Sequence, residues 1–86
     1  MTRPEQIRKE ILLQLYASRP LALTAGRMAR DARKEGYDYS AADVARETQF
    51  LMDEGLALEF PVAGSADRHC RISAEGVRQY ETLYQS

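Results

Sequence analysis

The sequence of 86 residues has little of several features that mark specialised classes of protein. Its one cysteine cannot form an internal disulfide, which fits a reducing cytoplasm. Its single histidine, His69, is adjacent to Cys70, so the two side chains cannot build a four-ligand zinc site. No run of about eighteen apolar residues predicts a membrane span, and no charged-then-apolar N-terminus indicates a signal peptide. We therefore expect a cytoplasmic protein without a metal, another cofactor or a membrane contact.

The sequence also lacks a strong excess of charge of either sign, because its net charge is −1. That balance excludes a strongly basic protein that binds nucleic acid regardless of sequence. The charges are nevertheless segregated along the chain. Residues 1–23 and 24–36 each carry +2, residues 37–59 carry −5, and residues 60–86 balance to zero. The acidic stretch therefore coincides with the helix that has the clearest pattern.

Hydrophobic residues make up 44% of the sequence, which is enough for one small domain over residues 1–86. Its clearest local pattern is a helix that ends at Gly55 and turns into a strand. Ser40 is a favourable N-cap, and Asp43 stands in the capping-box position. A buried stripe is predicted by three residues at helical spacing, Val44, Thr48 and Leu51. We therefore expect a helix over about residues 40–54.

Capping residues, apolar spacing and turn residues predict the other elements. The expected elements are helices over residues 3–18, 25–35 and from Ser73 onward, strands over 56–62 and 68–72, and a single bridge over 21–23. The sequence therefore predicts an α+β domain with the order helix, short strand, helix, helix, strand, strand, helix.

This order resembles the winged helix-turn-helix superfamily over about residues 5–84. Two local sequences add to the resemblance, Asp53-Glu54-Gly55-Leu56 at the end of the third helix and Ile72-Ser73-Ala74-Glu75-Gly76-Val77-Arg78 at the start of the last. In DNA-binding members of this superfamily, the third helix enters the major groove and the hairpin, or wing, contacts the backbone or the minor groove. The same fold also hosts phage accessory proteins and protein-docking modules, so it does not fix the function.

For a DNA-binding member, a helical wheel places Ala42, Asp43, Arg46, Gln49, Phe50 and Asp53 on the outer face of the third helix. Arg46 could pair with guanine and Gln49 with adenine, with Ala42 beside them as a base contact. Cations of the second helix and the second hairpin strand would hold phosphates, namely Arg27, Arg30, Lys34, Arg68 and Arg71. The same cations also suit a solvated surface, on which Asp31 pairs with Arg27 and Lys34.

The first hypothesis is thus a small dimeric transcriptional regulator that binds double-stranded DNA. The second is a winged-helix module, or a phage accessory protein, that binds a protein partner and not DNA. The acidic stretch motivates the second hypothesis, and so does Phe50, which either folds over the edge of the core or anchors a partner. Residues near the C-terminus are candidates for a dimer or partner contact, namely Tyr80, Leu83 and Tyr84.

An enzyme is not expected. Ser65, Asp67 and His69 have the residue types of a catalytic triad, but they fall in one exposed hairpin. A hairpin offers no preformed cleft and no oxyanion donors for such a triad.

Overall fold

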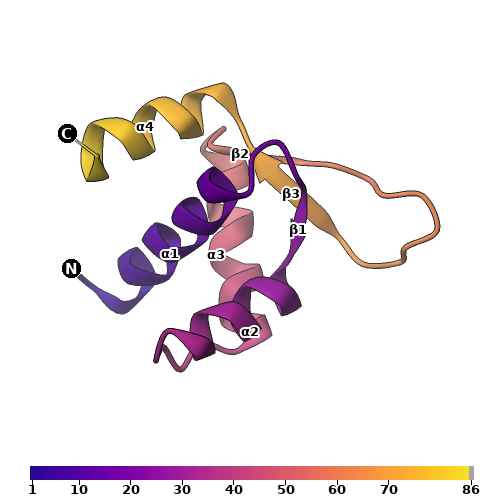
Figure 1. Cartoon of the computed structure of the whole chain (residues 1–86), viewed down its shortest axis with the longest axis horizontal. Helices are drawn as coiled ribbons and strands as arrows, with labels where there is room; N and C mark the ends of the chain where they lie inside the picture. Colours follow the sequence, from indigo (N-terminus) through magenta and orange to yellow (C-terminus); the bar gives the residue numbers. More distant parts are fainter. Residues whose placement is uncertain (86) are drawn as a thin grey trace.

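The computed structural model describes residues 1–85, which form four helices and one three-stranded antiparallel sheet (Figure 1). In chain order the elements are α1 (Arg3–Ala17), β1 (Leu23–Thr24), α2 (Ala25–Lys34), α3 (Ala41–Asp53), β2 (Ala57–Glu59), β3 (His69–Ile72) and α4 (Ala74–Tyr84). The expected α+β class and the expected order of elements are confirmed. In the described part of the chain, no helix is long and apolar enough to span a membrane.

Each helix begins at a side-chain hydroxyl that accepts a backbone N–H three residues later, at Thr2, Thr24, Ser40 and Ser73. The capping boxes at the first and third of these positions are complete, with Glu5 and Asp43 returning the hydrogen bond. Gly36 and Gly55 follow the ends of α2 and α3 with φ of 93° and 76°, a conformation that favours glycine. The predicted cap at Ser40 and the predicted stop at Gly55 are therefore confirmed.

The strand predictions were less accurate than the helix predictions. The expected strand over 56–62 is only Ala57–Glu59, and the expected bridge over 21–23 lies at Leu23–Thr24. Phe60 still donates its N–H to the carbonyl of His69 at 2.9 Å, but Pro61, which follows, has no N–H for a sheet. β3 lies in the centre of the sheet, between β1 and β2. The long β2–β3 hairpin extends away from the helices, opposite the two termini (Figure 1).

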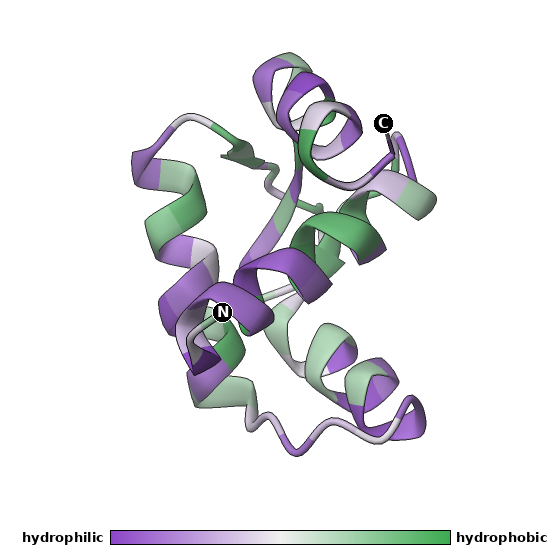
Figure 2. Cartoon of the chain, turned by 90° about the vertical axis from the view of Figure 1, so that its left-hand side faces the viewer, coloured by the Kyte–Doolittle hydropathy of each residue, from purple (hydrophilic) through white to green (hydrophobic). Residues whose placement is uncertain are grey.

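The core forms where one face of each helix meets the inner face of the sheet. All four helices alternate between hydrophobic and hydrophilic residues, as amphipathic helices do (Figure 2). Helix α1 contributes Ile7, Ile11, Leu12 and Leu15 to this core, and the predicted stripe of Val44, Thr48 and Leu51 is buried in α3. Gly76 lets α4 approach the start of β2, because a Cβ at this position would collide with the carbonyl oxygen of Leu56.

The three C-terminal residues predicted to form a partner contact differ in exposure. Tyr80 is only 7% exposed and stacks on Tyr16, with ring centroids 4.5 Å apart. The ring of Tyr80 therefore completes the packing of α4 on α1 and offers little surface to a partner. Leu83 is exposed and Tyr84 is half-buried.

Candidate nucleic-acid interface

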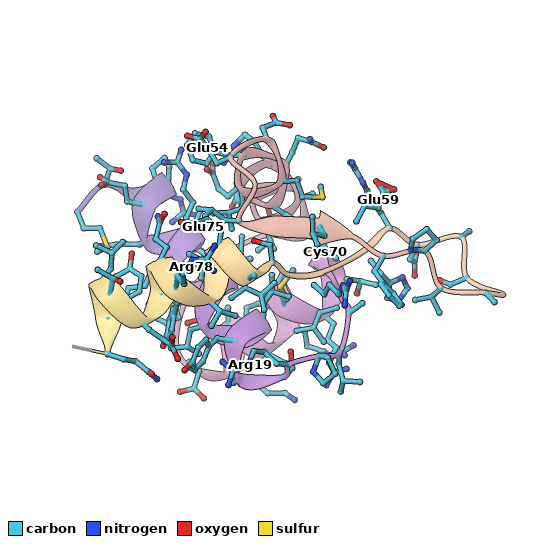
Figure 3. The ribbon with its side chains drawn as sticks, turned by 90° about the horizontal axis from the view of Figure 1, so that it is seen from above. Arg19, Glu54, Glu59, Cys70, Glu75 and Arg78 are labelled. Atoms are coloured by element: carbon cyan, nitrogen blue, oxygen red, sulfur yellow. The ribbon has the colours of Figure 1, made fainter. Side chains whose placement is uncertain are left out.

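Helix α3 and the β2–β3 hairpin are joined on one side of the molecule. Arg68, just before β3, donates from Nη1 to Oε1 of Gln49 in α3 at 2.8 Å. It also donates from Nε to Oε1 of Glu59 at 3.0 Å, and Glu59 points from the hairpin to the side on which α3 lies (Figure 3). We call the resulting surface the α3–hairpin surface and define it by Ala42, Ala45, Arg46, Gln49, Asp53, Glu59 and Arg68.

The three predicted base-contacting residues all lie on the α3–hairpin surface. Ala42 and Arg46 are exposed, and Gln49 is half-buried. Arg46 donates to Asp43 at 3.3 Å and to Glu47 at 3.1 Å, and these contacts, Glu47 first, raise the pKa of its guanidinium. Gln49 donates to Asp53 at 2.8 Å while it accepts from Arg68. Both polar side chains therefore have protein partners that a nucleic acid would have to replace.

A buried carboxylate underneath this surface was missed in the sequence. Glu47 is only 4% exposed, and its two oxygens accept from Nε of Arg8 at 2.8 Å and from Nε of Arg46 at 3.1 Å. The helical wheel does place position 47 on the buried side of α3, next to Leu51 at the edge of the stripe. An acidic residue at a buried helix position needs a cationic partner, so the position of Glu47 was the signal that the sequence offered.

Neighbouring arginines also neutralise other acids of residues 37–59. Asp43 is held by the backbone N–H and the hydroxyl of Ser40, then by Arg3 and Arg46, which together lower its pKa to about 2. Arg3, Arg8 and Arg68 come from outside the segment and pair with Asp43, Glu47 and Glu59, respectively. These three cations reduce the local net charge from −5 to −2.

The cations of α2 that were predicted to hold phosphates differ in whether they already form ion pairs within the protein. Asp31 pairs with Arg27 at 3.8 Å and with Lys34 at 3.6 Å, which confirms the ion pairs expected on a solvated face. Arg27 also lines an open groove between α1 and α2, of about 580 Å³. Arg30, by contrast, forms no ion pair with any residue in 1–85.

The two hairpin arginines lie on opposite faces of the hairpin. Arg68 shares the side of α3, whereas Arg71 places its guanidinium 5.1 Å from the ring centroid of Phe60. The Nε atom of Arg71 is buried without a hydrogen-bond partner among the described residues. The two arginines therefore do not form one phosphate-binding pair.

Phe50 was expected either to fold over the edge of the core or to anchor a partner, and its side chain has features of both roles. The guanidinium of Arg8 lies 3.6 Å from its ring centroid and covers one face of the ring at the edge of the core. The side chain is still 38% exposed. It can therefore contribute to a partner surface only beside α1.

Comparison with known proteins adds no assignment to these observations. No protein-family model matches the chain, and no curated protein matches its sequence.

Proposed function

We propose that this chain is a winged-helix domain, a small transcriptional regulator that binds double-stranded DNA with its α3–hairpin surface. The observation that carries the proposal is the hydrogen bond between Arg68 and Gln49, which holds the hairpin and α3 in one surface. The order of helices and strands supports the winged-helix class, in which the third helix and the hairpin both contact DNA.

The side chains of this surface suit a helix that enters the major groove. Ala42 and Ala45 are small and exposed, so the backbone of α3 can approach the base edges closely. Gln49 has the donor and acceptor that adenine requires, and Arg46 has the fork that guanine requires. Arg30 and Arg68 are the cations that would hold the phosphates on either side.

Releasing Arg46 to a base does not leave a buried charge alone. Its pair with Asp43 lies near the surface, and pairs of that kind contribute only about 0–1 kcal/mol. When Arg46 leaves, Glu47 still accepts from Arg8 at 2.8 Å. The protein therefore keeps its internal ion pair while the outer arginine changes partner.

A salt series with mixed-sequence duplex DNA tests this proposal through the double variant Arg30→Ala/Arg68→Ala. Each arginine that neutralises a phosphate adds roughly 0.9 to the slope of log affinity against log salt concentration. We expect fluorescence anisotropy to show binding at low salt that weakens as salt rises. The slope of the double variant should be lower by about 2 because two contacts are lost.

The double variant Arg19→Ala/Arg78→Ala is the charge-matched control. Arg19 lies on the side of the molecule opposite α3 (Figure 3), and Arg78 pairs with Glu75 on α4. It should retain the wild-type slope. Equal slopes in both double variants, or no binding at low salt, would reject the proposed surface.

A protein-binding module is the second candidate function, and one observation favours it. Leu58 and Phe60 are exposed at alternate positions and therefore share one face, away from Arg68, and Val62 is exposed farther along the hairpin. Exposed apolar rows of this kind mark partner sites in many proteins. If the salt series shows no DNA binding, the protein-binding function is favoured. The homodimer through Leu83 and Tyr84 is a separate prediction that stays open.

A further inference from the structure

A small recess lies where α2, α3 and β3 meet, beside the α3–hairpin surface. Its volume is about 70 Å³. The walls are mainly apolar, with Arg68 among the lining residues, and include Ala25, Ala45, Thr48, Met52 and Cys70. Because Arg68 also donates to Gln49, the recess is next to the residue expected to read adenine.

One polar group in this recess has no partner. Thr48 is 7% exposed, and its hydroxyl is buried without a hydrogen-bond partner in the part of the chain that the structure describes. A buried hydroxyl without a hydrogen-bond partner lowers the stability of the protein, and a ligand that supplies an acceptor would remove this cost. The recess therefore offers one unused hydrogen bond next to apolar walls.

The size of the recess limits what can enter. A cavity volume of roughly 10–15 Å³ holds one water molecule, so a recess of about 70 Å³ admits only a small group of atoms. Its mainly apolar walls and its one unpaired hydroxyl then select among the groups that fit. The best fit is a methyl group with a hydrogen-bonding oxygen beside it.

Thymine presents these two groups, the C5 methyl and the O4 acceptor, in the major groove. We infer that the recess binds this edge of a thymine, in the base pair that Gln49 contacts or in its neighbour. The methyl group packs against Ala45 and Met52, and the hydroxyl of Thr48 donates to O4. This inference rests on the proposed DNA binding and adds a determinant of sequence specificity to it.

The test begins with selection of preferred sequences from a random duplex library by the full chain. Each thymine of the selected sequence is then replaced singly by deoxyuridine, which removes only the methyl group. At one thymine, we expect the affinity to fall about fourfold, because the lost methyl group contributes about as much binding free energy as one buried methylene group. Replacing the same base pair by 5-methylcytosine paired with guanine keeps the methyl group but removes O4.

Three variants connect the effect to the recess. Ala45→Leu fills the recess and should abolish the difference between thymine and deoxyuridine. Ala74→Leu, at an exposed position of α4 outside the α3–hairpin surface, is the matched control and should keep that difference. Thr48→Val retains the shape without the hydroxyl, so it should still prefer thymine to deoxyuridine but lose part of its preference over 5-methylcytosine.

The outcomes separate the inference from the function on which it rests. A selected sequence in which no thymine is sensitive to deoxyuridine would overturn the inference and leave DNA binding intact. The same holds if Ala45→Leu and Ala74→Leu affect the thymine preference equally. No selected sequence and no salt-dependent binding would overturn both.

Discussion

At the residue scale, the burial and pairing of the Glu47 carboxylate reduce the negative charge that the acidic helix α3 presents to a polyanion such as DNA. The group is buried in a two-arginine contact, so it presents little charge to solvent. Arg8 pairs with it from the α1 side and is half-buried, whereas Arg46 is exposed and is free to change partner. A buried acid thereby orients an arginine toward the outer face of α3.

Removing the charge of Glu47 should destabilise the fold. In Glu47→Gln the side-chain volume is kept, but Arg8 and Arg46 lose the carboxylate they share. We expect the free energy of unfolding to fall by about 2 kcal/mol, less than for a fully buried pair because both arginines reach solvent. Urea denaturation followed by circular dichroism measures the change.

Asp53→Asn provides the control for this prediction. Asp53 is an exposed carboxylate of the same helix that accepts only from Gln49 among the described residues. Its substitution should change the free energy of unfolding by less than about 0.5 kcal/mol. If the two substitutions had equal effects, Glu47 would have no special structural role.

At the element scale, the close approach of α4 to the start of β2 depends on one glycine. Gly76 has no room for a Cβ next to the carbonyl of Leu56 and the side chain of Ile72. The backbone N–H of Ser73 also donates to that carbonyl, at 3.0 Å, which fixes the strand against the helix. The hairpin is therefore anchored to α4 at its base.

Two glycine-to-alanine substitutions should have opposite effects. Gly76→Ala forces α4 away from β2, and we expect it to lower the free energy of unfolding by about 2 kcal/mol. Gly26→Ala, in α2, meets no atom within 4 Å and should raise it by about 0.5–1 kcal/mol through helix propensity. Thermal unfolding of both variants measures this difference. A stabilised Gly76→Ala variant would show that α4 is not held close to β2.

At the scale of the whole molecule, the helices were predictable and the tertiary contacts were not. The ends of α1, α2 and α3 depend on nearby residues such as Thr2, Gly36 and Gly55, so the sequence placed them within a residue or so. Strand pairing is non-local, and the expected strand over 56–62 was too long.

The candidate site was predicted only in part for the same physical reason. A helical wheel places Ala42, Arg46 and Gln49 on the outside of α3, because that depends on one helix alone. The pairing of Glu47 with Arg8 joins residues 39 positions apart, and the recess at Thr48 requires three elements to meet. Neither feature has a local signature in the sequence.

The two faces of the hairpin give the molecule two unlike sides. On one side, Arg68 connects the hairpin to the outer face of α3. The other side carries the exposed apolar side chains of Leu58 and Phe60, with the guanidinium of Arg71 over the ring of Phe60. DNA binding and protein binding are therefore expected on different faces, which one experiment can distinguish.

That experiment is a titration of the isotope-labelled chain with duplex DNA, followed by amide chemical shifts in NMR spectra at low salt. We expect the largest changes at Ala42, Ala45, Gln49 and Arg68, and almost none at Leu83 on α4. This result would place DNA on the α3–hairpin surface. Changes centred on Leu58, Phe60 and Val62, or on α4 with α3 unaffected, would contradict it.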